Sequence, residues 1–116
     1  MTTLSLTDRA MSDLHDIISY STSTFGKKVA NRYLSDIEAA LLLIQEHPGI
    51  LKNKQEVSSW FSFYPVREHH LVCTVVDDRI IVLTIKHCHA DLPGRLLELE
   101  PTLFQEAEIL RNKLSG

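Results

Sequence analysis

Residues 67–89 read REHHLVCTVVDDRIIVLTIKHCH, and this stretch decides the fold of the chain. HLVCTVV is a β-branched run, Asp77 and Asp78 form a dipeptide typical of a tight turn, and RIIVLTIKH is a second β-rich run. Together they predict a β-hairpin. The run SSWFSFYPV lies just before it, is aromatic and alternating, and predicts a third strand. We therefore expect a three-stranded antiparallel meander.

Alternation along the last of these strands predicts its two faces. Both faces carry apolar residues, whereas an antiparallel sheet with one solvated face alternates more cleanly. We therefore expect a second cover for the sheet, provided by the C-terminal segment, a partner, or both. His87 shares its predicted face with apolar residues, so we expect it to point toward the helices. One face holds Ile81, Leu83, Ile85 and His87, and the other holds Ile80, Val82, Thr84 and Lys86.

Helical periodicity dominates the first half of the chain. Leu4 and Leu6 are spaced as in a short strand, and Thr7 then offers an N-cap for a helix that begins near residue 8. The hydroxyl-rich segment STSTFG, residues 21–26, favours a turn that ends this helix. A second helical pattern begins near Lys27 and is stopped by HPG at residues 47–49. The two predicted helices are expected to form an antiparallel hairpin.

The C-terminal segment, residues 96–116, is predicted to be a helical extension of the domain. Pro101 is placed for a helix start, and an apolar stripe comes after it. Packing of this stripe onto the chain's own sheet is the favoured interpretation, and a dimer or partner interface is the alternative. The chain, residues 1–116, is thus predicted to be one α+β domain ordered strand, helix, helix, three strands, helix. The stripe consists of Leu103, Phe104, Ala107, Leu110 and Leu114.

Composition narrows the class of protein. The chain has 116 residues, of which 44% are hydrophobic and 23% charged, as in an ordinary soluble domain with its own core. The net charge of −3 lacks the basic excess typical of nucleic-acid binding, so sequence-specific nucleic-acid contact is not expected. The longest apolar run, residues 39–44, is too short to span a membrane. Two cysteines and no secretory leader pattern predict a cytoplasmic protein with reduced thiols.

A metal site must be considered, because residues 67–89 hold four of the six histidines and both cysteines. On a continuing strand His87 and His89 would point to one face, and Cys88 to the other. Structural zinc sites bring paired ligands such as CxxC, and the sequence has no such pair. We expect no native metal site and no cofactor, and we interpret Cys73 and Cys88 as small buried hydrophobes.

Several motifs in fixed order carry a family resemblance. The chain reads AxxDLxDIxxY from Ala10, FG at residues 25–26, HP at residues 47–48, EHHLVC from Glu68, and IxVLxIxHxxxDxxxRL from Ile80. Over residues 4–97 this order resembles the ParE branch of the RelE/ParE superfamily, the toxins of bacterial type II toxin-antitoxin systems. The resemblance implies a RelE/ParE-like fold, β-α-α-β-β-β-α. In this fold a small antiparallel sheet carries the helical hairpin on one face, and a C-terminal helix comes last.

The resemblance also implies a function. ParE-like toxins poison DNA gyrase and so block replication, and each is neutralised by a ParD-like antitoxin; such pairs contribute to plasmid maintenance or stress response. Toxicity in this branch is linked to the C-terminal end of the sheet and the segment after it. A homodimer is left open, as is a chain that covers and regulates itself with its long tail. The partner-binding residues expected on this basis are His87, His89, Asp91, Arg95, Trp60 and Phe63.

A ribonuclease is the alternative function. RelE-type members of the superfamily cut ribosome-bound mRNA, which needs a base, an acid and cations for the phosphate. Lysines and arginines near the second predicted helix are interspersed with acidic residues, which is a thin electrostatic footprint for RNA. A non-toxic binding relic would give the same sequence pattern. The ribonuclease candidates are Arg67, Glu68, Lys86, His87 and Arg95.

Overall fold

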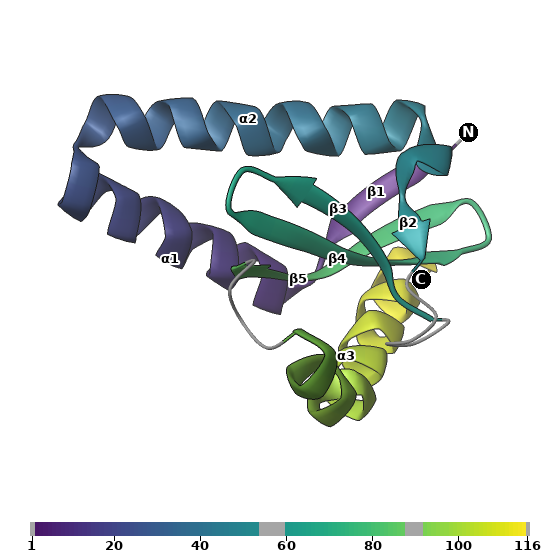
Figure 1. The fold of residues 1–116 in the computed structure, drawn as a ribbon. Coiled ribbons are helices and arrows are strands. Elements are labelled where there is room, and N and C mark those ends of the chain that lie inside the picture. Colours follow the sequence, from purple (N-terminus) through teal and green to yellow (C-terminus); the bar gives the residue numbers. More distant parts are fainter. Residues whose placement is uncertain (1, 54–59, 88–91, 116) are drawn as a thin grey trace.

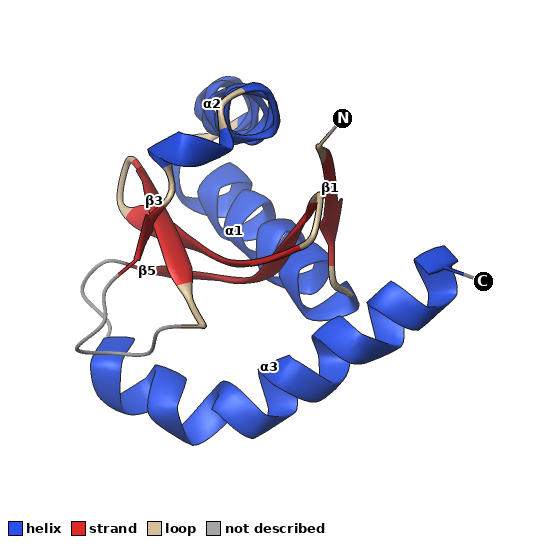
Figure 2. Cartoon of the chain, turned by 90° about the vertical axis from the view of Figure 1, so that its right-hand side faces the viewer, coloured by secondary structure: helices blue, strands red, loops and turns tan. Residues whose placement is uncertain are grey.

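The computed structural model describes residues 2–53, 60–87 and 92–115. A five-stranded sheet forms the middle layer, and the α1–α2 hairpin packs on one face of it (Figure 1). Helix α3 crosses the opposite face (Figure 2). No helix in these described ranges is long and apolar enough to cross a bilayer. The elements are β1 (Thr3–Leu6), α1 (Asp8–Phe25), α2 (Lys27–Glu46), the 3-10 turn η1 (Pro48–Ile50), β2 (Lys52–Asn53), β3 (Ser62–Val66), β4 (His69–Val76), β5 (Arg79–His87) and α3 (Leu92–Ser115).

The predicted α+β class and the β3–β4–β5 meander are confirmed. The strand order is β1-β5-β4-β3-β2, and every neighbouring pair from β2 to β5 is antiparallel. β1 instead runs parallel to β5, which makes the sheet mixed. No tight turn joins β1 to β5, so the connection does not force the two strands to run in opposite directions. The short strand β2 lies between η1 and β3 and was not among the predicted strands.

The helical hairpin is confirmed, and its turn is tighter than predicted. The Thr7 side chain caps α1 by accepting a hydrogen bond from the backbone N–H of Ala10 at 3.1 Å. The segment STSTFG does end this helix, but only at its last residue, because α1 continues through Phe25 and Gly26 is its C-cap. Thr22 donates its hydroxyl to the carbonyl oxygen of Ile18 at 2.8 Å, which satisfies this polar group within the helix. Gly26 alone separates the helices, at a φ of 94° that L side chains rarely adopt.

Helix α3 starts at Leu92, so the prediction that Pro101 begins it is wrong; Pro101 lies inside the helix. A proline there removes one intrahelical hydrogen bond, the one to the carbonyl of Leu97. Leu97 itself is an exposed residue of the helix. Leu96 on one side of the proline and Leu103 on the other are both fully buried against the sheet. Packing on both sides offsets the intrinsic cost of the proline.

Helix α3 covers the face of the sheet opposite the hairpin, as the apolar residues on both faces of β5 require. In the predicted stripe, Leu103 and Ala107 are buried and Leu110 is partly buried. Phe104 and Leu114 remain 49% and 45% exposed, so the stripe is narrower than predicted. The core therefore has two parts. Between the hairpin and the sheet lie Ala10, Ile37, Ala40, Ile44, Val66, Leu71, Cys73, Ile80, Val82 and Ile85; between the sheet and α3 lie Phe61, Phe63, Val72, Ile81, Leu83, Leu96, Leu103 and Ala107.

Strict alternation along β5 is interrupted by a bulge, so the predicted division of its faces is wrong. Cys73 pairs with Val82 and Val72 pairs with Thr84, which leaves Leu83 without a partner of its own on β4. One extra residue in a strand reverses the faces of everything after it. Ile80 and Val82 face the hairpin, Ile81 and Leu83 face α3, and Ile85 again faces the hairpin.

Candidate functional site

A groove of about 650 Å³ lies where the closed end of the helical hairpin, next to the Gly26 turn, meets the end of the sheet. It brings together three residues proposed from sequence, Arg67 and Glu68 in the β3–β4 turn and His87 at the end of β5. His87 faces the hairpin, as expected, although through the bulge and not through simple alternation. The lining residues are Asp16, Ile17, Tyr20, Ser21, Phe25, Val29, Tyr33, Arg67, Glu68, His69 and His87.

A pair of histidines forms the floor of the groove. His69 and His87 are directly opposite each other on β4 and β5, and their rings meet edge to face with centroids 5.1 Å apart. The hydroxyl of Tyr33, on α2, hydrogen-bonds to Nδ1 of His69. His87 Nε2 lies 3.5 Å from a carboxylate oxygen of Glu68. Burial lowers the pKa of His69 below its usual 6.5, and the neighbouring His87 lowers it further, so His69 favours its neutral form.

Two charged side chains at the rim of the groove, Arg67 and Glu68, contact other residues. Arg67 adopts a positive φ of 53° and forms an ion pair with Asp36 on α2. Its guanidinium carbon also lies 5.4 Å from the centre of the Tyr33 ring. The carboxylate of Glu68 contacts the ring of His87 on the same rim. Neither Arg67 nor Glu68 is therefore an isolated charge waiting for a ligand.

Two aromatic side chains stand at the mouth of the groove with most of their surface in solvent. Tyr20 is 68% exposed and Phe25 is 61% exposed, and both come from the second half of α1. Val29, at the start of α2, lies beside them in the lining and is also exposed. Large aromatic groups that line a cavity and face solvent are typical of protein contact surfaces.

The remaining sequence candidates do not join this groove. Lys86 pairs with His70 and points to the opposite face of the sheet from its neighbour His87. Phe63 is buried beneath α3, and Trp60 packs its ring against Phe104 at a centroid distance of 5.2 Å. Arg95 falls in the first turn of α3, where only the backbone is described. His89, Asp91 and Cys88 lie outside the described residues.

The metal interpretation gains no support from the described part of the chain, where no three His, Cys, Asp or Glu side chains are grouped to hold an ion. Cys73 is a buried core residue, as predicted. Burial raises the pKa of its thiol to about 12, which keeps it protonated and inert as a ligand.

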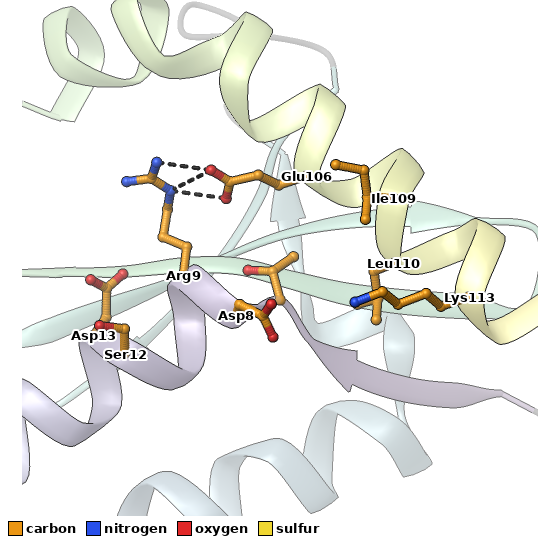
Figure 3. Close-up of a pocket in the computed structure, with 9 residues that line it drawn as sticks. Asp8, Arg9, Ser12, Asp13, Glu106, Ile109, Leu110 and Lys113 are labelled. Atoms are coloured by element: carbon orange, nitrogen blue, oxygen red, sulfur yellow. Dashed lines mark hydrogen bonds and ion pairs between the residues drawn. The ribbon is translucent and has the colours of Figure 1, made fainter.

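A second cavity, of about 520 Å³, lies between the start of α1 and the C-terminal half of α3 (Figure 3). Arg9 crosses it and binds the carboxylate of Glu106 through Nε and Nη2, at 2.8–3.1 Å. This hydrogen bonding raises the pKa of Arg9 and keeps the guanidinium charged. The contact fastens α3 to the body of the domain.

Sequence reasoning missed His69 and Tyr33, which are central to the groove. A two-residue turn at Asp77 and Asp78 would align His69 with Lys86 if both strands were regular. Only the bulge brings His69 opposite His87. Tyr33 fits the helical pattern of its segment, and nothing in that pattern marks it as a histidine partner.

The fold defined by this sheet, hairpin and groove is that of a toxin of the ParE/RelE type. A solved structure described as a chromosomal ParDE TA system from P. aeruginosa matches with a TM-score of 0.66 at 18% sequence identity. The match covers 75% of this chain and 96% of that chain. No curated protein sequence matches significantly.

The family is shown by sequence. The model of the ParE toxin of the type II toxin-antitoxin system parDE matches residues 4–92, and the chain belongs to this family. Membership in a parDE system implies an antitoxin as partner. Helix α3 begins where the family match ends, so the cover over the second face of the sheet lies beyond the part of the chain that the family model matches.

Proposed function

We propose that this ParE-family toxin inhibits DNA gyrase by binding it, and that a ParD-like antitoxin neutralises it in the cytoplasm. In this proposal the toxin stabilises the covalent gyrase–DNA intermediate and turns over no substrate itself. Plasmid maintenance or a stress response is the role that such a pair would serve.

The observation that carries the proposal is the character of the groove. Its rim pairs Arg67 with Asp36 and Glu68 with His87, and its mouth presents Tyr20 and Phe25 to solvent. A site for a polyanion offers cations to phosphate oxygens, whereas paired charges around exposed aromatic groups suit a protein partner. Lys86, the remaining cation proposed for RNA cleavage on β5, points away from the groove.

Induced expression without antitoxin tests the proposed target. We expect filamentation, a DNA-damage response and cleaved gyrase–DNA complexes with purified gyrase, while mRNA stays intact. The neighbouring reading frame, expressed together with the toxin, should restore growth and copurify with it. Absence of any toxicity would leave a non-toxic binding relic as the better description.

Groove variants test the proposed surface. Tyr20→Ala and Phe25→Ala remove exposed aromatic groups, so they should leave the fold intact and weaken binding of gyrase or of the antitoxin by about tenfold or more, the range typical of aromatic hot spots. Leu42→Ala is the matched control, because Leu42 is equally exposed on α2 and lies outside the groove. Equal binding by all three variants would exclude the groove as the contact surface.

The ribonuclease function remains the second candidate because the structure brings Arg67, Glu68 and His87 to one place together with His69. Such an enzyme would give ribosome-dependent mRNA cuts that disappear in Arg67→Ala and His87→Ala. His15→Ala is the control, because His15 is an exposed histidine of α1 outside the groove. If the ribosome-dependent cuts disappear in His87→Ala and persist in His15→Ala, gyrase poisoning is refuted.

A further inference from the structure

The bulge in β5 is held by the first turns of α1. The backbone N–H of Thr7 donates to the carbonyl of Val82 at 3.0 Å, and the hydroxyl of Thr7 donates to the carbonyl of Leu83 at 2.9 Å. Further along α1, the carboxylate of Asp13 accepts hydrogen bonds from the hydroxyl of Thr84 and from the backbone N–H of Ile85, the latter at 3.1 Å. The extra residue is thus enclosed by hydrogen bonds from the same helix and its cap.

The contact of the Thr7 hydroxyl is buried, and the two contacts of Asp13 are partly buried. Thr7 and Thr84 are 2% and 0% exposed. A bulge frees backbone groups from the regular ladder, and such groups are costly when buried without a partner. The carboxylate of Asp13 binds Thr84 and Ile85 together, directly after the bulge. The Asp13 carboxylate therefore binds β5 at the position where its side chains begin to alternate again after the bulge.

The position of the bulge decides which side chain enters the groove. Pairing before the bulge places Val76 opposite Arg79, and the same register carried forward would place His69 opposite Lys86. It would also turn Lys86 toward the hairpin and His87 toward α3, because a one-residue shift exchanges the faces. In the structure the bulge intervenes, and His87 meets His69 while Lys86 faces away.

We propose that Asp13 is a positioning residue of the groove: by holding the β5 bulge, it selects His87 over Lys86 as the side chain that faces His69 and Tyr33. This role requires no partner. Its consequence for toxicity rests on the proposed function, because it assumes that the groove is the contact surface.

The test compares Asp13→Ala with Asp13→Asn by NMR of the full-length chain. The two histidine rings are close enough for a nuclear Overhauser effect between their protons. Asp13→Ala should lose the His69–His87 cross-peak and gain one between His69 and the Lys86 side chain. Asp13→Asn keeps an acceptor oxygen in the same place and should keep the native cross-peak. Glu38→Ala, which removes an exposed carboxylate of α2 outside the groove, is the control.

Destabilisation alone would not change the neighbour of His69 in folded molecules, so this readout separates positioning from general support. Should Asp13→Ala fail to fold, the isosteric Thr84→Val removes one of the two hydrogen bonds and should weaken the His69–His87 cross-peak. A native cross-peak in folded Asp13→Ala, or in Thr84→Val when the alanine variant does not fold, would overturn the proposal.

The functional consequence is measured separately. If the groove contacts the target, Asp13→Ala should lose toxicity to the same extent as His87→Ala, and Asp13→Asn should restore it. If His87→Ala itself leaves toxicity unchanged, the proposed role of the groove fails. The NMR comparison would still test the role of Asp13, because it shows whether His87 or Lys86 lies next to His69.

Discussion

Replacement of Leu103 by alanine tests whether α3 is part of the cooperative core. Leu103 is fully buried between α3 and the sheet, against a cluster that includes Phe61 and Leu83. The substitution removes three buried carbon atoms, each worth about 0.8 kcal/mol, and leaves a cavity that adds to the loss. Helix propensity barely changes, because Leu and Ala both favour helices. We expect the free energy of unfolding to fall by about 3 kcal/mol.

Chemical and thermal denaturation measure this loss. For a domain of this size about 3 kcal/mol corresponds to a fall in Tm of roughly 12 °C. Leu97→Ala is the matched control on the same helix, since Leu97 is 55% exposed, and it should change stability by less than about 0.5 kcal/mol. Leu71→Ala, in the core beneath the hairpin, should cost as much as Leu103→Ala.

One pattern of stabilities would contradict the packing of α3 on the sheet. If Leu103→Ala behaved like Leu97→Ala while Leu71→Ala lost the full amount, α3 would not pack on the sheet in solution. The second face of the sheet would then be open, and α3 would be available as an interface.

Three further predictions concern individual contacts. In a Cys88→Ser background, Cys73 should resist alkylation at about pH 8 until the protein is unfolded, because its thiol has a pKa of about 12; rapid labelling of the native protein would contradict its burial. A double-mutant cycle on Arg9→Ala and Glu106→Ala should give a coupling of about 0.5–1 kcal/mol that shrinks with added salt, and zero coupling would mean that this ion pair does not fasten α3. NMR should show His69 titrating with a pKa below 6.5, which means that the unfolded chain binds this proton more tightly than the folded protein does. Acidification below about pH 6.5 should therefore destabilise the wild type more than His69→Gln. Equal acid sensitivity of the two proteins would contradict the lowered pKa.

Local signals in the sequence were sufficient for most of the architecture. Thr7 was recognised as an N-cap because its role depends only on the residues directly after it, and the structure shows that bond. The turn at Asp77 and Asp78, the helical hairpin and the buried state of Cys73 were equally predictable. The start of α3 was not, because the burial of Leu96 keeps the helix going ahead of Pro101 and no local rule contains that contact.

Only part of the candidate site could be predicted from the sequence. Arg67, Glu68 and His87 were named from sequence and do meet in one groove. Lys86 was named with them and lies on the other face, while His69 was not named and forms the floor. Lys86 and His87 are adjacent on a strand and face opposite sides in any register, whereas the pairing of His69 with His87 depends on the single unpaired residue in β5.

The helical hairpin, the β3–β4–β5 meander and the apolar character of both faces of β5 follow from the sequence, because periodicity, caps and turn residues act over a few positions. Tertiary structure alone decided which side chain of β5 enters the groove. Alternation divides the side chains of a strand between its two faces, and a one-residue bulge exchanges the faces of all residues after it. The amino-acid sequence carries no local sign of that bulge. Hydrogen bonds from Thr7 and Asp13, far away in the chain, hold the bulge and thereby choose the outcome.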